Sequence, residues 1–240
     1  MDDIFTRTRL LLGAEEMEKL KNARVAVFGL GGVGGYVVEA LARSGVGALD
    51  LTDNDVISPS NINRQIYALH STVGKKKTEA AKARVTDINP ACRVTTHDVF
   101  LLPETADRFD FTQYDYIVDA VDTVAAKLCL AEKAQAAGVP IISSMGTGNK
   151  LDPTKLEIAD IYDTSVCPLA RVMRYECRKR GIKKLRVLYS TETPLTPRAD
   201  ETPDNPTGRR SVPGSTAFVP PAAGLIIAAE VVREIAGAGR

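Results

Sequence analysis

The sequence predicts an α/β fold, a Rossmann-like and mostly parallel sheet with helices on both faces, from three observations. Short apolar runs alternate with helical patterns over the first 146 residues. A glycine-rich turn follows the first of these runs, and an acidic residue ends the second. The remainder, about residues 147–240, is less regular and carries no separate linker. We therefore expect one domain over residues 1–240, with an irregular half that extends the sheet.

The glycine-rich turn lies between a strand predicted over 24–28 and a helix that ends near Arg43. A second strand, predicted over 48–52, is followed by Asp53. This is the pattern of a dinucleotide- or nucleotide-binding turn, in which glycines allow a sharp bend, close approach to phosphates and tight helix packing. The glycines are Gly29, Gly31, Gly32 and Gly34, and Asp53 stands where a carboxylate can bind a ribose.

The other elements follow from apolar periodicity and from proline and glycine stops. Helices are predicted over 10–22, from the lysines at 75–77 to Ile88, and over 125–137, 168–180 and 217–235. Strands are predicted over 92–97, 116–122, 138–144, 156–161 and 185–189. The polar stretch 54–65 is expected to be a ligand-binding loop, the stretch 193–213 a mobile loop, and residues 5–9 a short arm before the first helix.

Composition narrows the classes of function. The net charge of +1 favours neither a nucleic acid nor a membrane globally, and no apolar run reaches the roughly 18 residues of a membrane span. The four cysteines form no CxxC pair, so we expect neither a zinc clip nor a redox pair, but reduced thiols in a cytoplasmic protein. His70 and His97 have no nucleophile nearby in sequence and are expected to be structural.

Five motifs occur in an order that resembles the adenylating domain of the ubiquitin-activating-enzyme superfamily, over about residues 5–146. They are residues 29–34 (GLGGVG), 53–55 (DND), 60–65 (SNINRQ), 74–77 (GKKK) and 119–122 (DAVD). The resemblance implies ATP-dependent adenylation of a carboxylate, with ATP and Mg²⁺ as cofactors. It assigns ribose binding to Asp53, nucleotide binding also to Asp55 and triphosphate binding to Asn61. It assigns both triphosphate binding and catalysis to Arg64 and Lys77, and the role of magnesium-linked catalytic acid to Asp122. It also implies a homodimer in which Arg9 reaches the partner subunit's site.

The second half indicates which carboxylate is activated. Residues 189–194 (YSTETP) and 209–224 resemble the tRNA threonylcarbamoyladenosine dehydratases, a family within this superfamily. That resemblance implies cyclisation of a modified base next to the tRNA anticodon, with net loss of water. The alternatives are activation of a small sulfur-carrier protein for thiamine or molybdopterin synthesis, and a noncatalytic scaffold. A cysteine desulfurase or sulfur-acceptor system stays open as a further partner.

A tRNA substrate requires local positive charge. The densest basic stretch supplies Arg171, Arg174, Arg178, Lys179 and Arg180, and a later loop adds Arg209 and Arg210. Composition alone favours a different interpretation, in which these residues form a solvated helix face and loop. The family resemblance favours a tRNA-binding surface.

Overall fold

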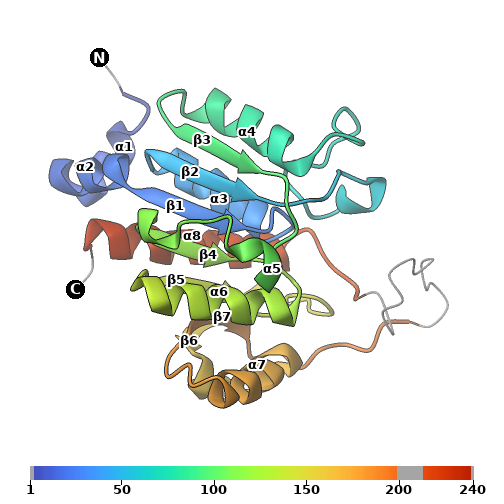
Figure 1. Ribbon diagram of the computed structural model, residues 1–240. Helices are drawn as coiled ribbons and strands as arrows, with labels where there is room; N and C mark the ends of the chain where they lie inside the picture. The colour runs from blue at the N-terminus through green and yellow to red at the C-terminus, as the bar shows by residue number, and fades with distance from the viewer. Residues whose placement is uncertain (1–2, 199–212, 239–240) are drawn as a thin grey trace.

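The computed structural model describes residues 3–198 and 213–238, and its centre is a seven-stranded sheet in the order β3-β2-β1-β4-β5-β7-β6 (Figure 1). The strands are β1 (Arg24–Phe28), β2 (Ala48–Thr52), β3 (Arg93–His97), β4 (Tyr116–Asp119), β5 (Ile141–Ser144), β6 (Leu156–Asp160) and β7 (Arg186–Ser190). Every neighbouring pair is parallel except β6 and β7. The predicted α/β fold is confirmed, and the irregular half adds β6 and β7 to the same sheet.

Helices cover both faces of this sheet (Figure 1). The α-helices are α1 (Thr6–Leu12), α2 (Ala14–Asn22), α3 (Gly34–Arg43), α4 (Lys77–Ile88), α5 (Pro103–Ala106), α6 (Val124–Ala137), α7 (Pro168–Lys179) and α8 (Val219–Ala236). Short 3₁₀ turns lie at Pro59–Asn61, Phe111–Gln113, Pro153–Lys155 and Ile161–Asp163. One layer contains α2, α3, α4 and α8, and the other contains α5, α6 and α7.

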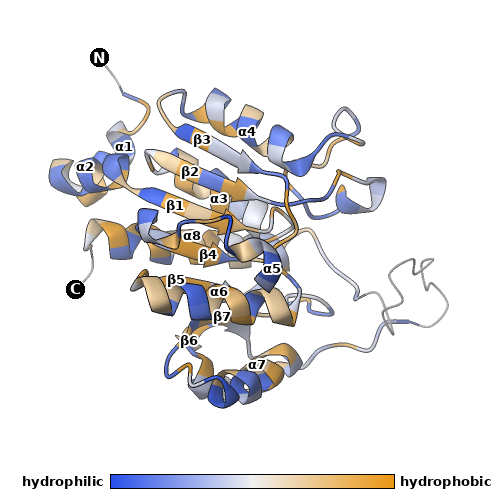
Figure 2. Cartoon of the chain, viewed as in Figure 1, coloured by the Kyte–Doolittle hydropathy of each residue, from blue (hydrophilic) through white to orange (hydrophobic). Residues whose placement is uncertain are grey.

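Three groups of buried side chains join these layers. The largest lies between α2, α3, α4 and α8 and one face of the sheet, and two smaller groups lie under α6 and α7. Hydrophobic residues accordingly concentrate in the central strands and in α8, whereas hydrophilic residues colour the lower part of α7 (Figure 2). Of the helices that the structure describes, none has the length and apolar character needed to cross a membrane.

The prediction of a single helix over 10–22, preceded by a short arm, is wrong. The chain forms two helices, because Gly13 adopts a φ of +98° and ends α1. Residues 6–9, expected in the arm, belong to α1, which buries none of its residues. Leu10 and Leu11 are 81% and 88% exposed, so the apolar periodicity there does not mark a face packed against this chain's core.

The order of the strands makes the boundary between β1 and β4 a topological switch point. From β1 the chain continues outward through β2 and β3, and it then returns to β4 on the other side of β1. Phe28, the last residue of β1, is level with Thr52 of β2 and Asp119 of β4. Open α/β sheets bind ligands at such a switch point, beyond the carboxyl ends of the strands. The glycine turn, Asp53 and Asp122 all follow these ends.

Candidate functional site

The glycine turn leaves space at one position and excludes side chains at others. Gly29 has a φ of +89°, and a Cβ there would lie 2.6 Å from the carbonyl oxygen of Ala120. A Cβ on Gly34 would lie 1.8 Å from the carbonyl oxygen of Gly29. At Gly31 the nearest atom, Nε2 of Gln65, would be 3.9 Å away. The turn is therefore closed around Gly29 and Gly34 and open at Gly31, next to the first N–H groups of α3, where an anion can be bound.

Asp53 and Asp55 follow the end of β2, and Asp53 is hydrogen-bonded to the glycine turn. One carboxylate oxygen of Asp53 accepts the N–H of Leu30 at 2.7 Å, and the other accepts the N–H of Asp55 at 2.9 Å. Asp53 is thus fixed beside the glycine turn, as its position in sequence predicted, and Asp55 is exposed. These bonds also show that Asp53 stabilises the local backbone.

Lys77 is buried at the start of α4 and lies between these two carboxylates. Its Nζ atom is 2.6 Å from Oδ2 of Asp55 and 3.6 Å from Oδ1 of Asp53. A positive charge at a helix N-terminus opposes the helix dipole. Here the two aspartates supply a nearby negative charge that offsets this cost and holds Lys77 beside Asp53.

Arg64 and Asn61 come from the polar loop after β2. The Oδ1 atom of Asn61 accepts the N–H of Ser58 at 3.1 Å and so shapes this loop. The guanidinium of Arg64 donates to the carbonyl of Ser60 at 2.9 Å, and burial lowers its pKa. A Cβ on Gly32 would lie 3.4 Å from Cγ of Arg64, which puts this arginine against the glycine turn.

Asp122 is exposed in the loop after β4, and its Oδ1 atom accepts a hydrogen bond from the hydroxyl of Thr123 at 3.3 Å. This loop touches the turn directly, because a Cβ on Gly34 would lie 3.2 Å from Cβ of Ala120. The predicted nucleotide residues from 29 to 122 therefore meet at one edge of the sheet.

A buried network beneath this loop was not predicted from the sequence. Asp119 and Lys127 form an ion pair with a distance of 3.1 Å, and neither side chain is exposed. The hydroxyl of Ser143 donates to Asp119 at 2.5 Å, and Lys127 donates to the carbonyl of Ser144 at 2.7 Å. Asp119 also accepts the N–H of Val121 at 3.2 Å, which fixes the loop that carries Asp122. The sequence did not predict this ion pair, because Asp119 ends a strand, Lys127 lies in a helix, and a lysine in a helix is usually exposed.

Arg9 does not join this site within one chain. It lies on α1, where its guanidinium pairs with Asp3. The neighbouring Phe5 packs near Gly45, after the C-terminus of α3. Figure 1 shows α1 beyond the opposite ends of the strands from the loops described above.

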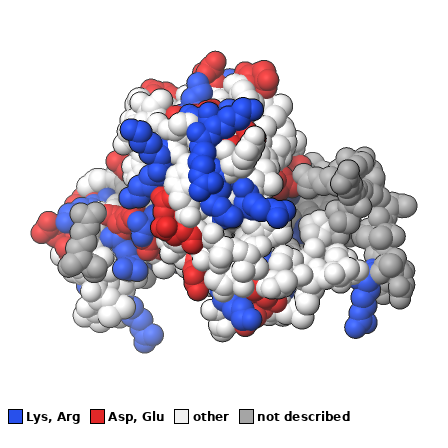
Figure 3. Space-filling view, turned by 90° about the horizontal axis from the view of Figure 1, so that it is seen from below, with Lys and Arg blue, Asp and Glu red and all other residues white. Residues whose placement is uncertain are grey.

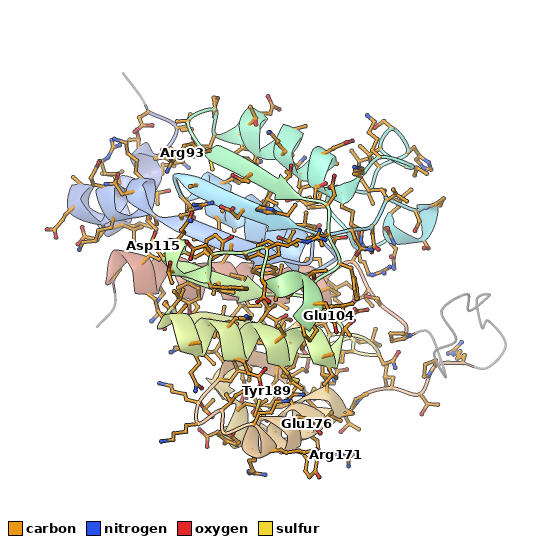
Figure 4. The ribbon with its side chains drawn as sticks, viewed as in Figure 1. Arg93, Glu104, Asp115, Arg171, Glu176 and Tyr189 are labelled. Atoms are coloured by element: carbon orange, nitrogen blue, oxygen red, sulfur yellow. The ribbon has the colours of Figure 1, made fainter. Side chains whose placement is uncertain are left out.

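The basic residues of the second half are not equivalent. On α7, Arg171 and Lys179 are exposed, and Figure 4 shows Arg171 at the outer rim of this helix. Arg174 instead donates to the carbonyl of Thr164 at 2.9 Å, and Arg180 lies 3.1 Å from Glu132. Arg178 lies over the ring of Tyr162, 5.2 Å from its centroid. Arg209 and Arg210 lie outside the described residues, as does most of the predicted 193–213 loop.

The flanks of that loop meet at Asn149, in the segment after β5. Its carbonyl accepts the N–H of Leu195 at 2.8 Å, and its N–H donates to the carbonyl of Gly214 at 2.8 Å. The chain then continues to Ser215, whose carbonyl accepts the side-chain amide of Asn63 at 3.1 Å. The segment before α8 therefore crosses the sheet edge toward the loop that carries Arg64.

The four cysteines and His97 contribute no reactive group to this edge. All four thiols are free and buried, and burial raises the pKa of Cys92 and of Cys177 to about 11 each. His97 lies 3.2 Å from the buried carboxylate of Asp50 and is structural, as predicted. Over residues 3–198 and 213–238, no group of three or more His, Cys, Asp or Glu side chains is arranged to hold a metal ion.

The chain resembles known proteins over nearly its whole length. The family model described as "ThiF family" matches residues 5–240. A Bacillus subtilis protein named tRNA threonylcarbamoyladenosine dehydratase is 44% identical, with 96% of this chain and 94% of the relative covered. The Escherichia coli protein of the same name is 36% identical, with 82% and 77% covered.

The solved structure of the E. coli dehydratase in complex with ATP superposes on this fold with a TM-score of 0.87 and 30% identity. This superposition covers 97% of the present chain and 93% of the solved one. Both the sequence comparison and the superposition therefore extend over the glycine turn, the polar loop and the strands described above. This chain belongs to the ThiF family.

Proposed function

We propose that this chain is an ATP-dependent tRNA threonylcarbamoyladenosine dehydratase that adenylates the side-chain carboxylate of its substrate. The observation that supports this most directly is the open position at Gly31, at the switch point of the sheet. Arg64 packs against the neighbouring Gly32, Asp53 joins Lys77 to the N–H of Leu30, and the loop that carries Asp122 touches Gly34. The named relatives, including one whose solved structure contains ATP, support the same assignment.

The residues present suit a nucleoside triphosphate. The amide-lined turn binds phosphate oxygens, and Asp53 is fixed where it can bind the ribose. Arg64 and Lys77 bring positive charge to the phosphates, and Asn61 holds the loop that carries Arg64. Attack of a carboxylate on the α-phosphorus releases pyrophosphate and increases charge on the phosphate oxygens. Fixed cations at these positions stabilise that charge.

Asp122 is the residue that would hold Mg²⁺. Magnesium in phosphoryl-transfer sites commonly uses one or two carboxylates, with water and phosphate oxygens as its other ligands. One exposed aspartate, in a loop that touches the glycine turn, therefore fits this ion, although the described residues form no larger acidic cluster. Bound with the triphosphate, Mg²⁺ would neutralise negative charge during transfer.

No strong base is required, because the attacking carboxylate is already ionised. Once the adenylate has formed, a nucleophile in the same modified base displaces AMP and closes the ring. The net result is loss of water from the nucleoside, with ATP converted to AMP and pyrophosphate. The buried cysteines fit this route, since cyclisation within the substrate needs no enzyme thioester.

We also propose that the enzyme acts as a homodimer in which Arg9 completes the partner's site. Helix α1, which carries Arg9, lies beyond the opposite ends of the strands from the glycine turn of the same chain, so we assign Arg9 to the site of another copy. The exposed Leu10 and Leu11 on the same helix offer apolar surface for such a contact.

The decisive experiment is mass spectrometry of tRNA nucleosides after incubation with the protein, ATP and Mg²⁺. We expect threonylcarbamoyladenosine to lose 18 Da, the mass of one water, while AMP and pyrophosphate accumulate only with the modified tRNA. Formation of ADP and phosphate would contradict adenylation. Exchange of pyrophosphate into ATP driven by a sulfur-carrier protein, with no change in tRNA mass, would instead establish the sulfur-carrier alternative.

A further inference from the structure

The exposed face of α7 carries an unusual mixture of side chains. Residues spaced three or four apart share one side of a helix, and the exposed set on this side is Arg171, Val172, Tyr175, Arg178 and Lys179. The opposite side, with Ala170, Met173 and Cys177, is buried against the sheet and α6. Tyr175 is 65% exposed and lies at the centre of the exposed set, one turn from Arg171 and one turn from Lys179.

This stripe has no acidic residue to neutralise its charges. Glu176, the one carboxylate on α7, is partly buried and lies 3.9 Å from Arg180. Arg178 is held over Tyr162, and Arg171 and Lys179 form no ion pair with any residue that the structure describes. Lysine and arginine side chains gather on the face seen from below, where α7 lies (Figure 3).

An aromatic ring exposed between free cations suits one class of ligand in particular. Single-stranded RNA binds proteins through phosphates on lysine or arginine and through unpaired bases stacked on aromatic rings. In a double helix the bases are already stacked on each other and cannot reach Tyr175. The hydroxyl of Tyr175 has no hydrogen-bond partner among the described residues, so the ring is free to turn toward a base.

We infer that the stripe formed by Arg171, Val172, Tyr175, Arg178 and Lys179 binds an unpaired segment of the RNA substrate, with Tyr175 stacking on a base. The inference rests on the proposed function, in which the substrate is a tRNA modified beside its anticodon. The anticodon loop supplies unpaired bases close to the reacting one. Tyr175 would thus help to select loop-containing RNA, while Arg171 and Lys179 bind phosphates on either side.

The first test measures stacking directly. The chain contains no tryptophan, so Tyr175→Trp introduces a single indole at this position. We expect its fluorescence to be quenched by an anticodon stem-loop but much less by a blunt RNA duplex at equal phosphate concentration. Leu225→Trp, at an exposed site on α8, is the matched control and should respond to neither RNA. Equal quenching of Tyr175→Trp by poly-glutamate would indicate a general polyanion or acidic-protein surface and would overturn the inference.

The second test separates stacking from charge. Tyr175→Ala should weaken stem-loop binding by about five- to a hundredfold, whereas Tyr175→Phe should bind like the unmodified protein. The slope of log affinity against log salt should stay unchanged in Tyr175→Ala. In Arg171→Ala or Lys179→Ala the slope should become shallower by about 0.7–0.9 for each phosphate that the variant no longer neutralises.

The two proposals fail in different ways. Normal nucleoside conversion with unchanged stem-loop affinity in Tyr175→Ala would overturn the stacking role and leave the dehydratase assignment intact. Quenching of Tyr175→Trp by loop RNA, with no conversion of any modified tRNA, would retain the RNA surface and reject the dehydratase assignment.

Discussion

The ammonium of Lys127 lies 3.1 Å and 3.2 Å from the two carboxylate oxygens of Asp119, and the side chains of both residues are inaccessible to solvent. Hydrogen bonds from the hydroxyl of Ser143 and to the carbonyl of Ser144 complete the surroundings of the pair. Because Asp119 also binds the N–H of Val121, the pair supports the loop that presents Asp122.

We expect Lys127→Met to lower the free energy of unfolding by about 3–5 kcal/mol, since it leaves a buried carboxylate without its counter-ion. Adding Asp119→Asn to this variant should restore part of the loss. Lys133→Met is the matched control on the same helix, and its exposed pair with Asp107 should contribute little because solvent screens it. Urea unfolding measures all three, and equal losses for Lys127→Met and Lys133→Met would contradict this account.

Two glycines of the turn should respond differently to the same substitution. Gly34→Ala places a methyl group 1.8 Å from the carbonyl oxygen of Gly29, so we expect misfolding or a loss of more than about 4 kcal/mol. In Gly31→Ala the new methyl group meets no atom closer than 3.9 Å, so the free energy of unfolding should lie within about 1 kcal/mol of the parent value. It should nevertheless weaken ATP binding by about tenfold or more, because the methyl group occupies the phosphate position. Calorimetry of unfolding and of ATP binding checks both results. Tight ATP binding by Gly31→Ala would show that the phosphates do not bind at Gly31.

Asp122→Asn should reduce pyrophosphate release by roughly a hundredfold or more while the protein remains folded, since it removes charge from the phosphate site without changing side-chain volume. Asp107→Asn, another exposed aspartate, should leave turnover unchanged. Near-normal turnover of Asp122→Asn at saturating Mg²⁺ would exclude the role assigned to this carboxylate.

The role of Arg9 across a dimer can be tested by mixing subunits. Arg9→Ala and Asp122→Asn should each be inactive alone, whereas a mixed dimer contains one site with both residues intact. We expect turnover to return to about a quarter of the parent value after complete exchange, since half of the dimers are mixed and each has one complete site. Arg7→Ala, on the same helix, is the control and should be active without a partner. If exchange is verified by native mass spectrometry and turnover stays absent, Arg9 does not act in trans.

Acid should destabilise the fold partly through Asp50. Burial raises the pKa of this carboxyl group, but hydrogen bonds from His97 and Arg24 outweigh it and leave the pKa below its usual value of 3.8. A lowered folded-state pKa gives stability that is present above the unfolded-state pKa and is lost as pH falls through the folded-state pKa. The melting temperature of Asp50→Asn should therefore fall less steeply than that of the parent from about pH 5 downward. Parallel melting curves across this range would show that Asp50 is not linked to acid unfolding.

The strands and the glycine turn were predictable because their constraints are local. Buried parallel strands appear as continuous apolar runs, as in residues 25–28 and 116–118, and a glycine turn permits few other residues. The predicted ends of helices were less accurate where the conformation of a single residue ends the helix. Gly13 ends α1, although the apolar pattern around it continues.

The side-chain partners could not be predicted, because they depend on packing between distant segments. In sequence, Arg174 and Arg180 look like any basic residue on a solvated helix, yet they bind Thr164 and Glu132. Lys127 looks equally exposed in sequence and is buried. The glycine turn and Asp53 were predicted from their own spacing, whereas Asn61, Arg64, Lys77 and Asp122 were assigned only through the resemblance of five motifs in one order. Their grouping at the sheet edge follows from the parallel topology.

Burial of all four thiols has a consequence for the conditions under which such an enzyme can operate. Hydrogen peroxide and other oxidants react with thiolates, and lack of access suppresses that reaction at all four positions. At Cys92 and Cys177 the raised thiol pKa suppresses it further. The proposed chemistry therefore needs no reductant to keep a nucleophile intact. Oxidative stress, which inactivates enzymes that depend on an exposed thiol, should leave this active site able to turn over.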